Sequence, residues 1–184
     1  VLTKLKLYFN ELEELLQAIY NLKELSLQAK DFILSYGERC SAFMVSQIAK
    51  QEIPYAEFAD AVQFIKTDSN FGQAKINNQL TEFLIKDFYA AKVDKMLFVT
   101  GFIASNDANK VTTLGRGGSD YTAAILGSAL NAKEIQIWTD VNGMMTADPR
   151  MVKKAFSLPE LSYIEAMELS YFGAKVIYPP TMTP

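Results

Sequence analysis

Apolar positions follow helical spacing through most of the first half of the chain. Between Leu2 and about Leu27 they recur every three or four residues with charged residues between them, which predicts one long amphipathic helix or two joined ones. Ser35-Tyr36-Gly37-Glu38 breaks this pattern, and a further helix is predicted from Arg39 to about Lys50, before Pro54. Another helix is predicted from Ile76 to Ala91. The N-terminal half is therefore expected to be mostly helical.

Short apolar runs suited to strands lie between and after these helices. Tyr55-Ala56-Glu57-Phe58 and Val62-Gln63-Phe64-Ile65 are strand candidates. Met96-Leu97-Phe98-Val99-Thr100 is a continuous apolar run bounded by glycine, which is typical of a strand buried on both faces of a parallel sheet. Further strands are predicted at Val111-Thr112-Thr113-Leu114 and at Glu134-Ile135-Gln136-Ile137-Trp138-Thr139.

Helical patterns in the second half alternate with these strands. One helix is predicted from Ser119 to Leu130, and another from Ser162 to Phe172, which Gly173 ends. Alternation of this kind predicts an α/β protein with a parallel or mixed sheet between helices. No internal repeat, low-complexity segment or linker divides the chain.

Composition narrows the chemistry that this fold could carry. The 184 residues are 49% hydrophobic and 21% charged, which is typical of one globular domain. The chain has no histidine and one cysteine, so Ser-His-Asp and Cys-His catalysis, histidine-ligated metals and a disulfide framework are excluded. An active site must therefore use Asp, Glu, Lys, Arg, Ser, Thr and the backbone.

Charge and hydropathy argue against two classes of partner. The net charge is −3 without a basic block, so nucleic acid is not an expected partner. No apolar run has the length of a membrane span, and the start of the chain lacks the features of a signal peptide. A cytoplasmic protein is expected, with a natural chain that begins before Val1.

The glycine-rich segment Gly115-Arg116-Gly117-Gly118-Ser119-Asp120 is the first candidate site. A strand, a glycine turn and a helix whose first N–H groups face the turn together suit a phosphate or carboxylate. Arg116 adds a planar fork for such an anion, and Ser119 is a suitable N-cap. Asp120 requires a cation or a lysine between it and the anion. The alternative is a tight strand-to-helix turn in which the helix dipole favours Asp120.

The second candidate is the segment from Trp138 to Arg150. Thr139 and Asp140 follow a predicted strand, and ligands bind at that end of the strands in open α/β sheets. Asn142-Gly143 and Asp148-Pro149 are turn signals, so the segment is expected to fold back as a small flap that carries Arg150. A hairpin with a structural aspartate would give the same pattern.

Two single residues are weaker candidates. Glu38 follows Gly37 at a predicted helix start, where a capping or dipole role is the alternative. Lys175 follows a predicted helix end and by itself would be a solvated lysine.

Four segments in order carry a resemblance to a known family. They are Ser35-Tyr36-Gly37-Glu38-Arg39, Val111 to Ala124, Trp138 through Arg150, and Phe172-Gly173-Ala174-Lys175-Val176. Together they resemble aspartokinases, which are members of the amino acid kinase family. The segment from Tyr163 to Gly173 is most similar to bifunctional enzymes in which the kinase is fused to homoserine dehydrogenase.

This resemblance implies a fold, a reaction and a set of site residues. The fold would be a three-layer α/β/α sandwich with a mostly parallel sheet. The reaction would be ATP- and Mg²⁺-dependent phosphorylation of the side-chain carboxylate of L-aspartate, at the start of the pathway to lysine, threonine and methionine.

The resemblance also assigns site residues. Arg116 would bind an aspartate carboxylate and Glu38 the amino group, with Phe102, Thr113 and Ser119 completing the pocket. Asp120 would organise phosphoryl transfer, and the nucleotide would be lined by Thr139, Asp140, Arg150 and Lys175. Such a reaction depends on positioning and charge neutralisation, so it does not need histidine.

The chain departs from the family at both ends. The family's opening segment Lys-Phe-Gly-Gly-Thr-Ser has no counterpart, and neither do the regulatory ACT domains. Residues 1–184 are therefore interpreted as part of an aspartokinase catalytic domain, poorly active alone and homo-oligomeric as the full-length protein. Two alternatives are another amino acid kinase, which the pair Glu38 and Arg116 disfavours, and a non-catalytic module that binds nucleotide or amino acid.

Overall fold

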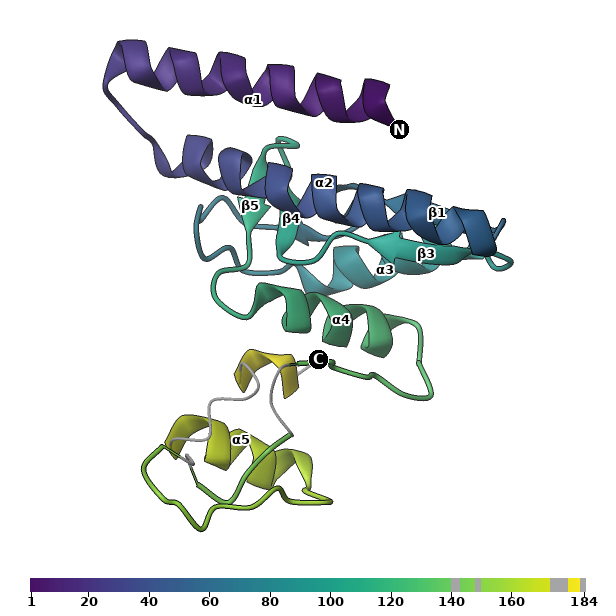
Figure 1. Ribbon diagram of the computed structural model, residues 1–184, viewed down its shortest axis with the longest axis vertical. Coiled ribbons are helices and arrows are strands. Elements are labelled where there is room, and N and C mark those ends of the chain that lie inside the picture. Colours follow the sequence, from purple (N-terminus) through teal and green to yellow (C-terminus); the bar gives the residue numbers. More distant parts are fainter. Residues whose placement is uncertain (140–142, 148–149, 173–178, 183–184) are drawn as a thin grey trace. The chain divides into compact units, whose positions relative to one another are not determined.

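The computed structural model describes residues 1–139, 143–147, 150–172 and 179–182 (Figure 1). It divides into two compact units, Val1–Ser119 and Asp120–Pro184, which are described separately. The elements in chain order are α1 (Leu2–Leu22), α2 (Leu27–Glu52), β1 (Ala56–Ala59), the 3₁₀ helix η1 (Ala61–Gln63), β2 (Lys66–Thr67), α3 (Asn78–Ala90), β3 (Met96–Val99), β4 (Ile103–Asn106), β5 (Val111–Thr113), α4 (Gly118–Ala129), α5 (Tyr163–Phe172) and the 3₁₀ helix η2 (Pro179–Met182).

One helix, α1, occupies the N-terminal apolar pattern as far as Leu22, and α2 begins where that pattern ends, at Leu27. Lys23 takes a left-handed conformation, with a φ of 56°, and ends α1. The Oγ of Ser26 accepts a hydrogen bond from the N–H of Ala29 at 3.1 Å and so caps α2. The predicted break at Ser35-Tyr36-Gly37-Glu38 is wrong, because α2 continues through it. A glycine inside a helix costs about 1 kcal/mol, and packing of buried side chains such as Tyr36 outweighs that cost.

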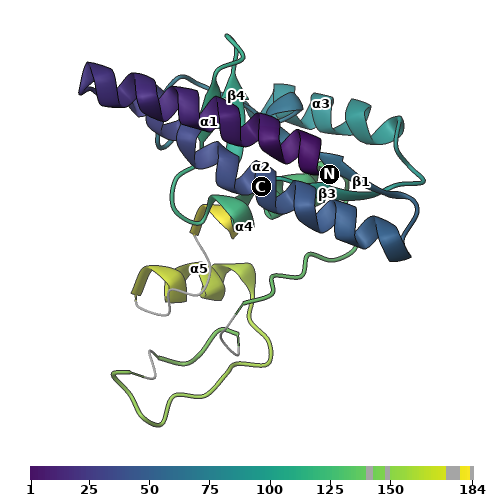
Figure 2. The same ribbon diagram turned by 45° about the horizontal axis from the view of Figure 1, so that its top comes forward.

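Helix α1 lies along α2, as both views show (Figures 1 and 2). The rings of Tyr8 and Tyr36 meet edge to face with their centroids 6.1 Å apart. The hydroxyl of Tyr36 donates to the carboxylate of Glu11 at 3.0 Å, and burial raises the pKa of this phenol. No residue of α1 is buried, so this helix packs against the first unit through one face only.

The strands of the first unit form two small sheets. β1 pairs with β3 in parallel, β2 pairs with β4 in parallel, and β4 pairs with β5 antiparallel. The strands predicted from Tyr55, Met96 and Val111 are confirmed within a residue or two. The mixed α/β class, with parallel strand pairs, is confirmed as well.

Two details of the strand predictions are wrong. Most of the run Val62-Gln63-Phe64-Ile65 lies in η1 and the turn after it, because the Asp60 carboxylate accepts the N–H of Val62 and starts a helical turn. The run from Met96 to Val99 is not buried on both faces: Met96 is exposed and the other three residues are half-buried.

Four large apolar side chains form the centre of the first unit: Phe64, Ile65, Ile85 and Ile103 are at most 1% exposed. Ile85 lies on α3, as predicted from the helical pattern, and the rings of Phe64 and Phe88 stand 4.6 Å apart. Buried threonines surround this core, and each satisfies its hydroxyl internally, as Thr67 and Thr112 do with each other at 2.7 Å. The first unit therefore combines an apolar core with buried hydrogen bonds between distant segments.

The second unit contains most of α4, together with α5 and η2, and the described residues between α4 and α5 form no further helix or paired strand apart from one isolated bridge between Met145 and Ser157. Gly127 allows close packing, because a Cβ there would lie 2.3 Å from Cδ1 of Ile135. α5 starts at a capping box in which Ser162 Oγ accepts the N–H of Glu165 and the Glu165 carboxylate accepts the N–H of Ser162. The predicted strand Glu134–Thr139 is wrong: these residues pair with no strand in the described chain, and Trp138 is 90% exposed. Gly173, the predicted end of α5, lies outside the described residues.

None of the helices in the described ranges combines the length and apolar character that a bilayer crossing requires.

Candidate active site

A strained turn at Phe102 follows the end of β3. The φ of Phe102 is 67°, a conformation that a bulky side chain rarely adopts, and the N–H of Ile103 donates to the carbonyl of Gly101 at 2.7 Å. A γ-turn of this kind costs on the order of 1–3 kcal/mol. The carbonyl of Phe102 accepts the N–H of Leu114 at 2.9 Å, which holds the turn in place. The surrounding structure thus fixes a backbone that local preference opposes.

The glycine turn packs directly against this strained turn. A Cβ on Gly118 would lie 2.9 Å from Cδ2 of Phe102 and 3.0 Å from Cβ of Leu114. A Cβ on Gly101 would lie 3.0 Å from both Cβ and Oγ of Ser119. Close packing within the protein therefore explains both Gly118 and Gly101. For Gly118, this is what the tight-turn alternative expects. The prediction of Ser119 as N-cap is wrong, because α4 already begins at Gly118 and Ser119 lies in its first turn.

Arg116 lies at the tip of the turn and is exposed. The residues on either side, Gly115 and Gly117, have φ angles of 76° and 74°, which glycine adopts without strain. A Cβ on Gly115 would also lie 3.3 Å from the carbonyl oxygen of Gly72. The turn therefore rests on the loop at Gly72 and presents the guanidinium of Arg116 to solvent.

Thr113 precedes the turn and is 1% exposed. Its hydroxyl donates to Oδ1 of Asp31 at 2.8 Å, and its N–H donates to Oδ2 of Asp31 at 3.0 Å. The structure thus brings Phe102, Thr113, Arg116 and Ser119 together around one turn, although the Thr113 side chain is directed at Asp31 and not at solvent.

The buried carboxylate of Asp31 was missed by the sequence reasoning. It is 1% exposed on α2 and also accepts the N–H of Gly72 at 2.8 Å. The available signal was an acidic residue directly before the apolar run Phe32-Ile33-Leu34. Its partners lie far along the chain, so no local pattern could have indicated them.

Glu38 lies two turns further along the same helix. Its carboxylate is half-buried, and burial raises its pKa. It has no hydrogen-bond or ion-pair partner within the described part of the chain. The capping alternative is wrong, because Glu38 stands well inside α2 and not at its start. A half-buried carboxylate without a partner is ready to accept hydrogen bonds from a cationic ligand.

The residue after Glu38 anchors α2 to two strand ends. Nε of Arg39 contacts Oδ2 of Asp60, just after β1, at 2.8 Å, and both side chains are mostly buried. Thr100, just after β3, donates to the same carboxylate at 3.5 Å and accepts the N–H of Ala61 at 2.8 Å. Glu38 is therefore held on a helix that is attached at the carboxyl ends of β1 and β3.

Two of the residues expected to line the nucleotide, Thr139 and Arg150, are exposed in the second unit. Asp120, expected to organise phosphoryl transfer, lies in the first turn of α4. The predicted return of the chain is seen in two hydrogen bonds, from the N–H of Thr146 to Phe156 at 3.0 Å and from the N–H of Leu158 to Met144 at 2.8 Å. Asp140, Lys175 and the turn residues Asn142 and Asp148-Pro149 lie outside the described residues.

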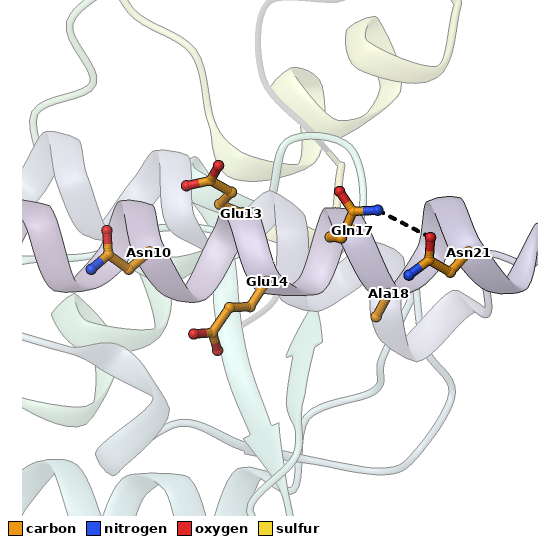
Figure 3. Close-up of a pocket in the computed structure, with 6 residues that line it drawn as sticks. All are labelled: Asn10, Glu13, Glu14, Gln17, Ala18 and Asn21. Atoms are coloured by element: carbon orange, nitrogen blue, oxygen red, sulfur yellow. Dashed lines mark hydrogen bonds between the residues drawn. The ribbon is translucent and has the colours of Figure 1, made fainter.

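A depression on α1 is a poor alternative site. Its lining residues are Asn10, Glu13, Glu14, Gln17, Ala18 and Asn21 (Figure 3). All six belong to one helix, and the amide of Gln17 donates to Asn21 at 3.0 Å, so no groups from separate elements converge there. Among the described residues, no group of three or more acidic or cysteine side chains could hold a metal ion.

Fold and site together define a class of protein. Mixed α/β architecture places a glycine turn, an exposed guanidinium and a half-buried carboxylate in one unit, which suits a small molecule with both anionic and cationic groups. The model of the amino acid kinase family matches residues 4–184, and the chain belongs to that family.

Curated relatives of the chain are aspartokinases. Lysine-sensitive aspartokinase 3 of Escherichia coli (strain K12) is 37% identical over 180 residues, which are 95% of this chain and 40% of that protein. Chloroplastic aspartokinase 1 of Arabidopsis thaliana is 40% identical, over 96% of this chain and 32% of that protein. Chloroplastic bifunctional aspartokinase/homoserine dehydrogenase 2 of Arabidopsis thaliana is 39% identical, over 95% of this chain and 19% of that protein. The chain thus spans 40% or less of these three relatives.

Solved structures give the same result for the fold. Escherichia coli aspartokinase III in complex with aspartate and ADP, in its R-state, matches with a TM-score of 0.84 and 36% identity, over 94% of this chain and 40% of that chain. The same enzyme in complex with lysine and aspartate, in its T-state, matches with a TM-score of 0.78 and 35% identity, over 97% of this chain and 42% of that chain. The predicted resemblance to aspartokinases is confirmed. Relatives with and without a homoserine dehydrogenase match at similar identity.

Proposed function

We propose that the protein containing this chain is an aspartate kinase, which phosphorylates the side-chain carboxylate of L-aspartate with ATP. The observation that carries this proposal is the half-buried, unpartnered carboxylate of Glu38 in the same unit as the exposed guanidinium of Arg116. An α-amino acid presents an ammonium and a carboxylate on one carbon, and these two side chains match that pair of charges. The names of the relatives supply the particular amino acid.

In this proposal Arg116 binds a carboxylate of aspartate through its planar fork, and Glu38 accepts hydrogen bonds from the ammonium. Phe102 and Ser119 form the wall of the pocket beside the glycine turn. Thr113 contributes indirectly and does not contact aspartate with its hydroxyl, because that hydroxyl already donates a hydrogen bond to Asp31. Aspartate is thereby held with its side-chain carboxylate free to react.

The nucleotide is assigned to the second unit by the chemistry of its side chains. A hydroxyl at Thr139 and a guanidinium at Arg150 suit phosphate oxygens, and Asp140 and Lys175 are proposed to complete this set. When bound, Mg²⁺–ATP supplies the phosphoryl group. Asp120, in the first turn of α4, is proposed to organise the site of transfer.

Location and assembly remain predictions. The cytoplasm is proposed as the compartment, although some curated relatives are chloroplastic. The full-length protein is proposed to be a homo-oligomer.

The test uses the complete gene product and traps acyl phosphate with hydroxylamine, comparing aspartate with glutamate. Aspartate-dependent turnover, with little turnover of glutamate, is expected. Nucleotide binding without turnover of either amino acid would favour a non-catalytic module. Turnover of another acceptor would favour a different amino acid kinase.

Arg116→Lys sharpens the assignment of the aspartate carboxylate. Lysine keeps the charge but loses the planar fork of the guanidinium. The fall in kcat/KM for aspartate is therefore expected to correspond to a loss of about 2 kcal/mol of transition-state stabilisation, while KM for ATP changes little. Lys110→Arg, an exposed change in the same unit, is the control. Unchanged kinetics for aspartate would remove Arg116 from the site.

A further inference from the structure

We propose that Asp31 is a positioning residue for the aspartate site, which holds the helix carrying Glu38 in register with the turn carrying Arg116. The proposal rests on the proposed function. Asp31 is remote from the open surface, at 1% exposure, so its action on a ligand must pass through the segments that it joins.

The carboxylate joins three segments that are far apart in the sequence. Oδ1 accepts the hydroxyl of Thr113, while Oδ2 accepts the N–H groups of Thr113 and Gly72. Thr113 is 82 residues and Gly72 41 residues from Asp31. Two of the three donors are backbone groups, so Asp31 fixes the course of the main chain and not only a side-chain rotamer.

Both segments held by Asp31 support Arg116. β5 ends at Thr113, three residues before Arg116, so a shift of that strand moves the guanidinium. The loop at Gly72 lies beneath Gly115, whose Cβ, if present, would approach the Gly72 carbonyl to 3.3 Å. The turn is therefore supported by Asp31 from two sides.

The same residue sets the position of Glu38. Seven residues of α-helix make two turns, so Glu38 stands about 10 Å from Asp31 along α2 and on a similar face. Because Asp31 fixes α2 against β5, it fixes the offset between the carboxylate of Glu38 and the guanidinium of Arg116. A ligand that bridges those two charges depends on that offset, whereas a nucleotide bound elsewhere does not.

Joining segments through a buried carboxylate has a cost in free energy, because the charged group is removed from water. Its desolvation is offset only while its hydrogen bonds are made, so an apolar replacement leaves the Gly72 and Thr113 N–H groups unsatisfied. Asparagine is the conservative replacement. Its oxygen can accept hydrogen bonds from the two N–H groups. Its NH₂ can donate to Thr113 Oγ1, so that the hydroxyl of Thr113 accepts a hydrogen bond where it donates one to Asp31.

The test compares Asp31→Ala, Asp31→Asn and Thr113→Val in the complete gene product. The matched control is Thr81→Val: Thr81 is also 1% exposed, and its hydroxyl joins α3 to Lys66 at 3.0 Å, away from the candidate site. For each variant, kcat, KM for aspartate, KM for ATP and Tm are measured.

Asp31→Ala and Thr113→Val are expected to raise KM for aspartate on the order of tenfold while KM for ATP changes less than about twofold. Asp31→Asn is expected to restore much of the loss. Thr81→Val should lower Tm with KM for aspartate unchanged.

A drop in Tm without a selective change in KM for aspartate would overturn the proposal, and so would equal changes in both KM values. If Asp31→Ala does not fold, Thr113→Val decides by the same criterion. A wild-type protein that does not use aspartate would instead overturn the proposed function, and this inference with it.

Discussion

The two units of the chain use polar groups in different ways. In the first unit, buried polar side chains connect segments that are distant in sequence, as Asp31 does with Thr113 and Arg39 with Asp60. In the second unit, side-chain hydrogen bonds such as those between Ser162 and Glu165 and between Gln136 and Glu134 link residues that are close in the sequence. Large apolar side chains such as Trp138 and Met151 are more than 80% exposed there.

This difference separates two sources of order. Long-range buried bonds and an apolar core cooperate, so the first unit is expected to unfold as one body. Helix caps and helical hydrogen bonds act within a few residues, so order in the second unit is expected to vary along the chain. The following substitutions test that distinction.

Phe64→Ala is expected to have the largest effect. Phe64 is 1% exposed in the core of the first unit, and its truncation should cost about 3–5 kcal/mol of unfolding free energy. Trp138→Ala, at a residue that is 90% exposed in the second unit, should stay within about 0.5 kcal/mol. Urea denaturation followed by circular dichroism measures both. Equal losses would contradict the contrast between the units.

Arg39→Met is expected to be next in size. It leaves the mostly buried Asp60 carboxylate without its cation, at a cost of about 2 kcal/mol. Lys86→Met breaks the exposed ion pair with Glu82 on α3, which should cost no more than about 0.5 kcal/mol. Hydrogen exchange should show lost protection in both β1 and β3 for Arg39→Met. Loss confined to α2 would mean that this ion pair does not connect the strands.

Ser162→Ala should act locally in the second unit. Removal of the capping hydroxyl is expected to destabilise α5 by about 1 kcal/mol, because the N–H of Glu165 loses its acceptor. Hydrogen exchange at residues 163–170 should accelerate, while the first unit keeps its protection. Ser128→Ala, an exposed position in α4, is the control. Loss of protection throughout the chain would show that the second unit is as cooperative as the first.

Glu38→Gln is expected to give the smallest change in stability, and of opposite sign. Burial raises the pKa of Glu38 above its ordinary value of 4.5, so stability from this group is present below that value and is lost as pH rises through the folded pKa. At neutral pH the ionised carboxylate is therefore unfavourable, and glutamine should slightly stabilise the protein while aspartate use falls. Unfolding free energy measured from pH 4 to pH 8 tests this. Glu14→Gln on the exposed side of α1 should show neither effect, and a loss of stability at pH 7 in Glu38→Gln would refute the sign.

Sequence reasoning succeeded where the signal was local. The spacing of apolar residues predicted α3 and α5, and the run after Tyr55 predicted β1. It failed where partners decide the outcome: Glu134–Thr139 has a strand-like composition but finds no neighbouring strand in the described chain. Gly37 is compatible with a helix end, yet burial of the helix on both sides of it keeps α2 continuous.

The candidate site shows the same division. Glycines and Arg116 could be recognised because a turn has a local signature, and the family resemblance assigned further residues. Asp31 could not be recognised, because its role is defined by donors 41 and 82 residues away. The part of a site that contacts a ligand is thus easier to infer from one sequence than the part that keeps it in shape.

The bond between Asp31 and Thr113 also has a consequence for the order of folding. Closing a chain loop of 82 residues costs about 4 kcal/mol of entropy by simple chain statistics, before any bond at the junction forms. The helix around Asp31 and the hairpin of β4 and β5 need only short-range contacts, so both can form while the carboxylate is still hydrated. Asp31 is therefore expected to meet Thr113 late in folding, so that the register of Glu38 and Arg116 is set only when the first unit is complete.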